Sequence, residues 1–429
     1  MLLVGILCGL IQTIIIFIIL KRLIIERKFS FNYTFLIIYY LIFTVPLILD
    51  MILGIPKYSE RSQYVYELVN TEEVALIFNI INVIIFGIFF TFKKEFSLDI
   101  NLLKIKRGFL INSMLLILSI MPVFLSIINI NNIPSFKYGY LVAVSKYNPS
   151  ILPLYEMFLN ITMISVPAGL VYLILNPKKH IYISWVVYTS VILSMYMNGK
   201  RMVVFLFFIL LLVKVYINNK KSFMIMACLS IFSIITFNNF YSNYMDDKYG
   251  LNKFSDDKYL QYRIDYSRDH NVKMAIFKEI NENENKILEY RGESFLYNLS
   301  FFMSRENWEN KPYPYGVYVT AASVGLSQAQ SLGWQMTTSL LDESIANLGL
   351  FFGVCFFILF FIIVFKIGYS FKENILILTT TNFIIFLFLT MQFSFSMPFV
   401  LSWLFLIAFN YIRNKLKHTQ NLKFNEYEK

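Results

Sequence analysis

The chain has 429 residues, of which 57% are hydrophobic and only 15% are charged, whereas a typical soluble domain has about 45–50% apolar and about 25% charged residues. So few charged side chains cannot cover a surface in water, and the apolar residues come in long unbroken runs. The composition therefore excludes a soluble globular protein and predicts an all-α polytopic membrane protein.

Eleven apolar runs are candidate transmembrane helices, because a helix needs about 20 apolar residues, with about 17–25 tolerated, to cross the hydrocarbon core. The first run lacks the basic N-terminal region and the small-residue cleavage site of a signal peptide, so we expect it to be retained. The seventh, eighth and eleventh runs are short enough to be re-entrant or interfacial instead. In chain order the runs are 1–20, 31–55, 74–92, 108–128, 151–175, 181–198, 202–217, 222–238, 346–366, 374–392 and 397–412.

Lys and Arg gather in alternate connections, which predicts the orientation of the chain. Cytoplasmic connections of membrane proteins are enriched in these residues. With eleven spans, every basic connection falls on one face, so we expect the N-terminus outside and the C-terminus in the cytoplasm. The basic segments are 21–28, 93–107, 178–179, 214–221, 366–372 and 413–417.

The segment 239–343 then lies on the external face. It has eleven Lys or Arg and fifteen Asp or Glu, so it is net −4, while the remainder of the chain is +15. The overall charge of +11 is thus the sum of an acidic external segment and a basic remainder. Because membrane orientation accounts for the basic residues, we expect no nucleic-acid partner. Since long structureless loops are uncommon, the segment is expected to form a subdomain with helices. The predicted parts are membrane helices in 1–238, the external loop 239–343, membrane helices in 344–412 and a basic tail, 413–429.

Familiar signatures of soluble enzymes are absent from the sequence. It contains no Walker A loop, GxGxxG turn, HExxH or GxSxG. The three cysteines show no CxxC spacing, and no external group of His and carboxylates has metal-ligand spacing. We expect neither a metal nor another cofactor.

The most unusual local sequence is 304–316, within the predicted loop. Its two prolines remove backbone donors, which predicts an ordered but irregular segment. Arg305 and Lys311 could bind phosphate oxygens, and Gly316 closes the segment. The alternative interpretation is an interfacial aromatic belt with snorkelling cations. The aromatic side chains that could stack on sugar rings are Trp308, Tyr313 and Tyr315.

Two further groups could carry chemistry. Lys200 and Arg201 lie in a predicted external connection, against the charge trend, so they could bind an anionic group or simply snorkel. Asp342 and Glu343 precede the ninth span, where they could favour a helix N-terminus or accept a proton from a hydroxyl. Asp50 lies within an apolar run, where ionisable side chains often line polar cavities. His270, in a charged stretch expected to be solvated, is a weaker candidate base.

These residues resemble a known family pattern. The Arg305-x-x-Trp308-x-x-Lys311-Pro312 segment is similar to one found in Wzy-type polymerases of O-antigen and capsular polysaccharide repeat units, and Arg305 and Gly316 fit that family's Arg-x10-Gly spacing. Glu343, Asn347 and Gly349 resemble the motif before a later span, although Asp342 stands where glycine is usual. Gly199-Lys200-Arg201 is similar to the family's Gly-x-Arg.

The resemblance implies a GT-C-like glycosyltransferase in the bacterial cytoplasmic membrane. It would extend a glycan on undecaprenyl pyrophosphate by transfer to a hydroxyl of a lipid-linked repeat unit, with a flippase and a chain-length regulator as possible partners. Arg201, Arg305 and Glu343 would be catalytic. The residues that would contact pyrophosphate or glycan are Lys200, His270, Trp308, Lys311, Tyr313, Tyr315, Gly316 and Asn347.

Other functions remain open at this point. A ligase that transfers finished glycan would use a similar donor and cationic site. A lipid-linked sugar transporter should instead distribute polar residues along its spans and show repeat symmetry. A membrane scaffold or sensor would need no paired arginines.

Overall fold

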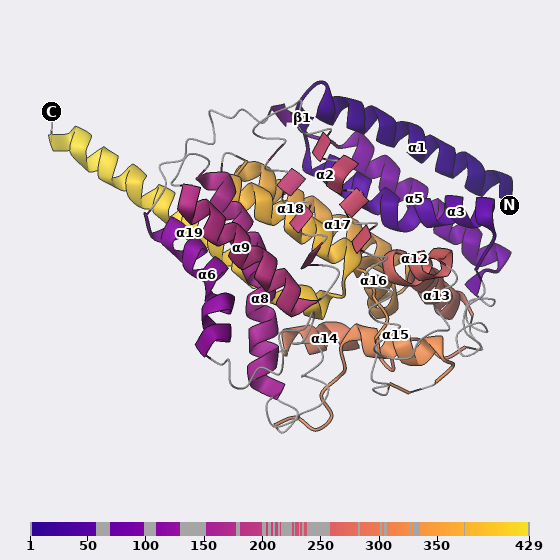
Figure 1. The fold of residues 1–429 in the computed structure, drawn as a ribbon. Helices are drawn as coiled ribbons and strands as arrows, with labels where there is room; N and C mark the ends of the chain where they lie inside the picture. Colours follow the sequence, from indigo (N-terminus) through magenta and orange to yellow (C-terminus); the bar gives the residue numbers. More distant parts are fainter. Residues whose placement is uncertain are drawn as a thin grey trace. The chain divides into compact units, whose positions relative to one another are not determined.

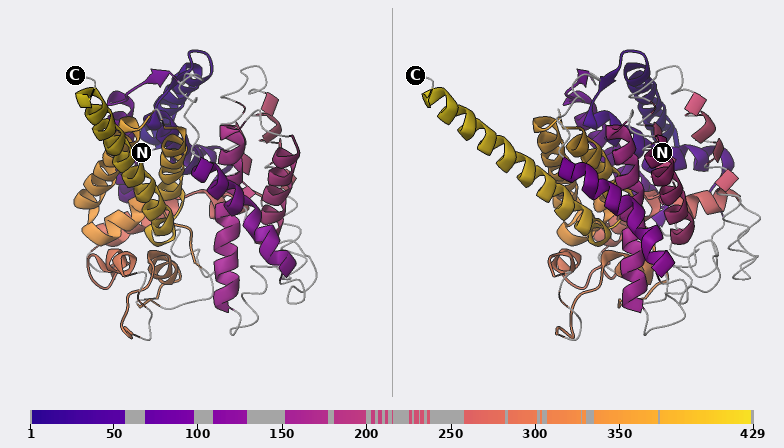
Figure 2. Two further views of the ribbon diagram at one scale, coloured as in Figure 1. Left: turned by 90° about the vertical axis from the view of Figure 1, so that its left-hand side faces the viewer. Right: turned by 60° about the vertical axis from the view of Figure 1, so that its left-hand side comes forward.

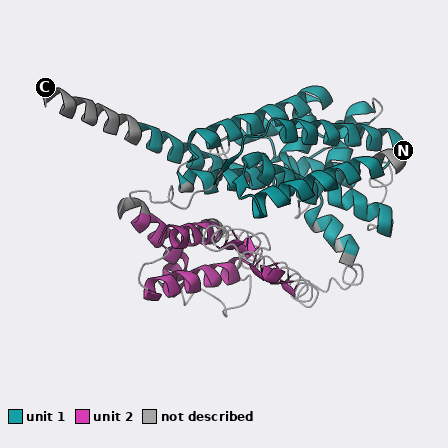
Figure 3. Ribbon diagram, turned by 90° about the horizontal axis from the view of Figure 1, so that it is seen from above, with its two compact units in different colours: residues 1–97, 256–429 teal, residues 98–255 magenta. Residues whose placement is uncertain are grey.

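The computed structural model describes residues 2–56, 69–97, 109–128, 152–176, 181–199, scattered positions within 203–237, and most of 258–427, with short gaps at 282–283, 301–302, 304–306, 327, 330–334 and 373. The described chain is almost entirely helical. It divides into two compact units, 1–97 with 256–429, and 98–255 (Figure 3). The 258–343 part of the predicted loop therefore belongs to the same unit as the first and last apolar helices.

The N-terminal part of the first unit is three apolar segments joined at one end by a two-stranded sheet. Phe29 of β1 pairs antiparallel with Phe96 of β2. Pro46 lacks a backbone N–H, and a π-helical turn precedes it. The elements are α1 (Leu2–Ile24), β1 (Lys28–Phe29), α2 (Phe31–Tyr39), η1 (Tyr40–Thr44), α3 (Val45–Leu53), α5 (Glu72–Thr91) and β2 (Phe96–Ser97).

The C-terminal part of this unit begins with short helices and continues with long apolar ones. Helices α17 and α18 pack against each other, and α18 packs against α19 (Figure 2). The elements are α12 (Lys258–Tyr266), α13 (Asp269–Ile280), α14 (Glu293–Leu299), α15 (Tyr315–Ser323), α16 (Leu340–Leu348), α17 (Leu350–Ser370), α18 (Ile375–Thr390) and α19 (Phe393–Tyr427).

Aromatic rings fill the core between α2, α5 and α17. The Phe35 ring lies 4.3 Å from that of Phe89 and 4.7 Å from that of Phe361, centroid to centroid. All three side chains are fully or almost fully buried. On the opposite side, α1 exposes large apolar residues such as Phe17, 68% exposed, as suits a helix that faces lipid tails.

The second unit is built around α6 (Phe109–Ile128), α8 (Leu152–Leu175) and α9 (Ile181–Asn198). Small and polar residues join these helices: Ser190 Oγ donates to the Ser119 carbonyl at 2.6 Å, and a Cβ on Gly169 would lie 2.5 Å from Val191. Close helix contacts of this kind are typical of membrane bundles.

Apolar helices match nine of the eleven predicted spans. Five described helices are long and apolar enough to cross a membrane: Gly5–Ile24, Phe31–Leu53, Glu72–Thr91, Ile181–Asn198 and Leu350–Ser370. Four shorter apolar helices are Asn112–Ile127, Ile161–Leu175, Leu376–Thr390 and Phe399–Ile412. The membrane class is thus confirmed. Most of 202–217 and 222–238 lies outside the described residues, so the total of eleven spans and the orientation stay predictions.

One predicted boundary is wrong. We expected the ninth span to begin at 346, but α16 ends at Leu348 and the apolar helix α17 starts at Leu350. Gly349 separates them with φ 85° and ψ 170°, a conformation open almost only to glycine. Glu343 therefore lies in a separate short helix.

The described part of the predicted loop lies at one end of the first unit. Helix α13 packs against α5 and α16, and Arg263 of α12 reaches Asp50, one turn before the end of α3. The β1–β2 sheet lies at the opposite end of α2 and α3 (Figure 1). The described loop helices and the basic segment 21–28 thus occupy opposite ends of the same helices.

Candidate functional site

Glu343 lies at the centre of a buried hydrogen-bond network between α14, α16 and α19. Its Oε1 accepts from Ser294 Oγ at 2.9 Å and from Asn298 Nδ2 at 3.2 Å. Its Oε2 accepts from the backbone N–H of Phe393 at 2.8 Å. Because Phe393 is the first residue of α19, the carboxylate binds one of the free N–H groups of that helix. Glu343 caps a neighbouring helix.

Asn347 completes this network, which we call the Glu343 cluster: Ser294, Asn298, Glu343, Asn347 and the Phe393 N–H. Asn347 Nδ2 donates to Ser294 Oγ at 2.7 Å and to the Glu343 carbonyl at 2.6 Å. Glu343 and Asn347 are 0% exposed. Since Glu343 is fully buried and its two oxygens accept from three donors on α14 and α19, the carboxylate links these helices and has no exposed oxygen.

Asp342 caps its own helix. Its Oδ1 accepts from the Ser339 backbone N–H at 2.7 Å and from the Ser339 hydroxyl, in a capping box at the start of α16. The capping interpretation of the two carboxylates thus holds for Asp342. Burial raises the pKa of both Asp342 and Glu343 to about 7. Each carboxylate therefore gains a proton far more easily than an exposed one.

Tyr315 and Gly316 begin α15 and connect it to the later helices. Tyr315 is fully buried, and its hydroxyl donates to the Asp342 carbonyl at 3.1 Å. The Gly316 N–H donates to Gln392 Oε1 at 2.6 Å, and a Cβ on Gly316 would lie 2.7 Å from that oxygen. A side chain at Gly316 would fit only if the flexible end of Gln392 moved. Tyr315, expected to stack on a sugar, is fully buried here, so its ring offers no exposed face.

Lys311 also differs from expectation. Its side chain is buried, Nζ donates to the Met303 carbonyl at 2.7 Å and lies 4.8 Å from the centroid of the Tyr297 ring. This ammonium is occupied within the chain and is no open phosphate site. Trp308 and Tyr313 are half-buried. The expected irregular structure is confirmed for 307–314, which contains no helix.

His270 is buried in an ionic cluster, contrary to the solvated environment expected for it. Arg263 Nη2 lies 2.5 Å from His270 Nε2. Since a guanidinium can only donate, Nε2 accepts and the imidazole is neutral. Burial, aided by the charges of Arg263 and Lys273, holds the pKa of His270 well below its usual value. The histidine is therefore unsuited to act as a base.

Arg263 is the main partner in what we call the Arg263 cluster: Asp50, Arg263, Asp269, His270 and Lys273. Arg263 Nη1 and Nη2 donate to the two Asp269 carboxylate oxygens at 2.6 and 3.0 Å, and Nη2 lies 2.9 Å from Asp50 Oδ2, within ion-pair distance. Lys273 Nζ lies 3.5 Å from Asp269 Oδ2. Burial favours the protonated Asp269, but the adjacent positive charges of Arg263 and Lys273 outweigh it and hold its pKa well below the usual range.

Sequence reasoning identified Asp50 but not its partner. An acidic residue in an apolar run signals an internal cation, yet the cation stands more than 200 positions later, at Arg263, among many charged residues. For Glu343, likewise, no sequence signal identifies Ser294 and Asn298 as donors. Arg201, Lys200 and Arg305 lie outside the described residues, so their predicted roles stay predictions.

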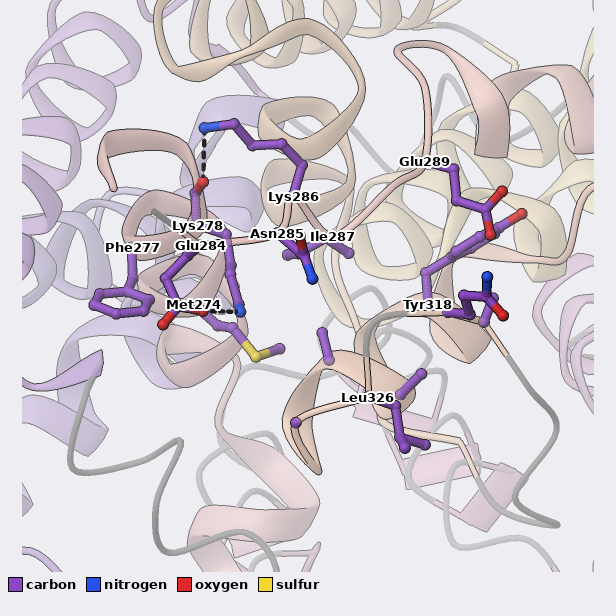
Figure 4. Close-up of a pocket in the computed structure, with 15 residues that line it drawn as sticks. Met274, Phe277, Lys278, Glu284, Asn285, Lys286, Ile287, Glu289, Tyr318 and Leu326 are labelled. Carbon is purple, nitrogen blue, oxygen red and sulfur yellow. Dashed lines mark hydrogen bonds and ion pairs between the residues drawn. The ribbon is translucent and has the colours of Figure 1, made fainter. Parts of the chain in front are cut away.

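A cavity of about 170 Å³ lies between α13, the segment 284–289 and α15 (Figure 4). Met274 and Leu326 contribute apolar surface, while Asn285 and Glu289 contribute polar groups. Lys278 Nζ, on the same wall, binds Glu284 at 2.6 Å.

Among the described residues, no group of three or more His, Cys, Asp or Glu side chains is arranged to hold a metal ion. Comparison of the chain with protein-family models, with curated protein sequences and with solved structures finds no match.

Proposed function

We propose that this chain is a membrane glycosyltransferase that polymerises lipid-linked oligosaccharide repeat units on the outer face of the bacterial cytoplasmic membrane. The donor is a glycan on undecaprenyl pyrophosphate, and the acceptor is a hydroxyl of a second lipid-linked repeat unit. The observation that carries the proposal is the segment Arg305-x-x-Trp308-x-x-Lys311-Pro312, followed by Glu343 and Asn347.

Structural support comes from a contact between the element that follows the Arg305–Pro312 segment and the helix that contains Glu343 and Asn347. Lys311 and Pro312 lead directly into α15, whose first residue, Tyr315, bonds to the Asp342 carbonyl. Asp342 and Glu343 are adjacent in α16, and Glu343 in turn binds the start of α19. The segment after Arg305 is thus joined to the helix of Glu343 by a hydrogen bond.

The reaction forms a bond from the acceptor oxygen to C1 of the donor glycan and breaks the bond from C1 to the pyrophosphate oxygen. The acceptor hydroxyl loses its proton, and the pyrophosphate leaves with the electron pair. In the proposal, Arg305 and Arg201 bind the negative charge that develops on this leaving group. Glu343 acts as a positioning residue, since its carboxylate is fully engaged with protein donors.

The test is polymerisation by the purified full chain in detergent, with lipid-linked repeat unit as the only substrate and products separated by length. We expect a ladder that is unaffected by a chelator. Arg305→Ala and Arg201→Ala should each lower its rate at least about tenfold, since charge-assisted contacts contribute about 1.5–3 kcal/mol. Lys286→Gln, a change at an exposed lysine, is the control and should leave the ladder unchanged.

Wild-type levels of polymer from folded variants of both arginines would overturn the assigned roles. Transfer of finished glycan to another acceptor without a ladder would favour the ligase. Movement of lipid-linked units across vesicle membranes without any glycan transfer would favour the transporter.

A further inference from the structure

The turn between α1 and β1 contains a strained arginine. Among the described residues, Arg27 is the one non-glycine residue with a positive φ, 54°. Side chains disfavour this region because Cβ approaches the following carbonyl oxygen, and glycine adopts it freely. The backbone alone would therefore favour glycine at this position. An exposed guanidinium is found instead, which suggests that its charge has a function.

Arg27 belongs to an exposed group of cations that we call the basic rim. Its members come from segments far apart in the chain but adjacent in the fold: β1 pairs with β2, and Ser30, next to β1, bonds to Tyr369 near the end of α17 at 2.7 Å. Lys94 Nζ lies 5.8 Å from the centroid of the same tyrosine ring. The basic rim comprises Lys21, Arg27, Lys28, Lys94, Lys366 and Lys372.

Among the described residues, two carboxylates lie beside the basic rim and neutralise only part of its charge. Lys28 Nζ lies 3.1 Å from Glu26 and 3.8 Å from Glu95. Glu95 also binds Arg22, which is half-buried and not part of the rim. Two carboxylates are thus shared with these two cations, and positive charge remains in excess at this end of the helices.

Large apolar side chains are exposed close in sequence to cations of the basic rim, Ile25 two residues before Arg27 and Phe92 two residues before Lys94. Ile25 is 60% exposed and Phe92, at the end of α5, is 79% exposed. Each of these two side chains lies where an apolar helix ends and cationic residues begin. A ligand that suits this surface has an anionic head next to an apolar tail.

We propose that the basic rim binds the phosphodiester headgroup of an anionic phospholipid, with Arg27 contacting the phosphate and the acyl chains lying along Ile25 and Phe92. The guanidinium fork of arginine fits phosphate oxygens bidentately. Each cation near an anionic bilayer surface strengthens binding by about fivefold. The apolar flanks favour a lipid over free phosphate.

The test uses the purified full chain in neutral detergent. Its thermal midpoint is measured during titration with phosphatidylglycerol, with phosphatidylcholine or with inorganic phosphate. We expect phosphatidylglycerol to raise the midpoint more than the other two. Arg27→Gly should weaken the apparent affinity for phosphatidylglycerol about fivefold. Because this variant relieves the backbone strain, its midpoint in phosphatidylcholine should equal or exceed that of the wild type.

Two control variants separate charge from folding. Arg27→Lys keeps the charge and should keep most of the response to phosphatidylglycerol, and Lys286→Gln removes an exposed cation elsewhere and should keep all of it. Equal responses to the two lipids would overturn the proposal, as would an unchanged response in Arg27→Gly. Protection by inorganic phosphate equal to that by phosphatidylglycerol would overturn it in favour of a site for a soluble anion.

Discussion

Glu343 experiences two opposing effects. Removal from water favours its protonated form, whereas three donors, from Ser294, Asn298 and Phe393, favour the ionised form. The burial effect is the larger, since the pKa is raised to about 7. A buried acid that titrates near neutrality makes the link between α16 and α19 dependent on pH.

A group whose pKa is higher in the folded than in the unfolded chain stabilises the fold below its unfolded pKa, and this stabilisation is lost as the pH rises through the folded value. For Glu343 the loss should reach about 1 kcal/mol between pH 6 and pH 8. Glu343→Gln is neutral at every pH, so its thermal midpoint should fall less over this range than that of the wild type.

The glutamine can be accommodated in the Glu343 cluster. Its carbonyl can accept from Phe393, and Asn298 Oδ1, which makes no hydrogen bond within the described residues, can accept from its amide once the asparagine amide turns over. Glu309→Gln, at an exposed position, is the matched control and should follow the wild-type curve. If the curves of wild type and Glu343→Gln ran parallel, the pKa assignment would be wrong.

Individual residues could be predicted from sequence only where the interaction is local. The capping role of Asp342 follows from Ser339 three positions earlier. The burial of His270, Lys311 and Tyr315 could not be predicted in this way. It depends on partners that lie far away in the chain or on how the irregular segment folds back. The sequence predicted a solvated His270 and gave Lys311 and Tyr315 ligand-binding or interfacial roles, whereas the structure gives all three side chains partners within the protein.

Single elements were predicted well where apolar runs are long. Nine predicted spans coincide with described apolar helices, since hydropathy over about 20 residues reports on a whole helix at once. The break between α16 and α17 was missed because the apolar character continues across Gly349. The sequence marks this break only by a glycine between a helix with a polar face and an apolar helix. Without knowledge of the packing, such a glycine does not predict that one helix ends and another begins.

Gly353 holds these two helices in close contact. A Cβ at this position would lie 2.6 Å from both Cα and N of Ile345, and neither backbone atom can move without shifting α16. We therefore expect Gly353→Ala to cost about 1–3 kcal/mol, measured as a lower thermal midpoint in detergent. Gly87→Ala in α5 is the control, since its Cβ would meet nothing within 4 Å. The close packing would be disproved if the two variants were equally stable.

At the scale of the molecule, the Arg263 cluster connects the described loop helices to the apolar helices. Asp50 belongs to α3, whereas Arg263 and Asp269 belong to the segment after residue 256. Sequence could predict that this segment contains helices and an excess of acid, because both follow from local composition. It could not predict that the segment docks through a buried ionic cluster, which depends on two residues 213 positions apart.

Charge balance within the Arg263 cluster makes this docking testable. Arg263 and Lys273 oppose Asp50 and Asp269, with His270 neutral, so Asp269→Asn leaves one buried positive charge in excess. Loss of one partner of a buried pair costs about 3–5 kcal/mol, so we expect a lower thermal midpoint and faster hydrogen exchange in 258–280. Because the pKa of Asp269 is lowered by folding, its stabilisation is present at neutral pH and disappears in acid. The deficit of the variant should therefore shrink as the pH falls.

Asp269→Asn with Lys273→Met restores the balance, since Arg263 keeps Asp50 at 2.9 Å. The double variant should consequently be more stable than the sum of the two single changes predicts, by about 0.5–3 kcal/mol, the usual coupling energy within one network. Hydrogen exchange in 258–280 should be slower in the double variant than in Asp269→Asn, because docking and stability depend on the same charges. Strictly additive losses would mean that Asp269 and Lys273 act independently, and would contradict this charge balance.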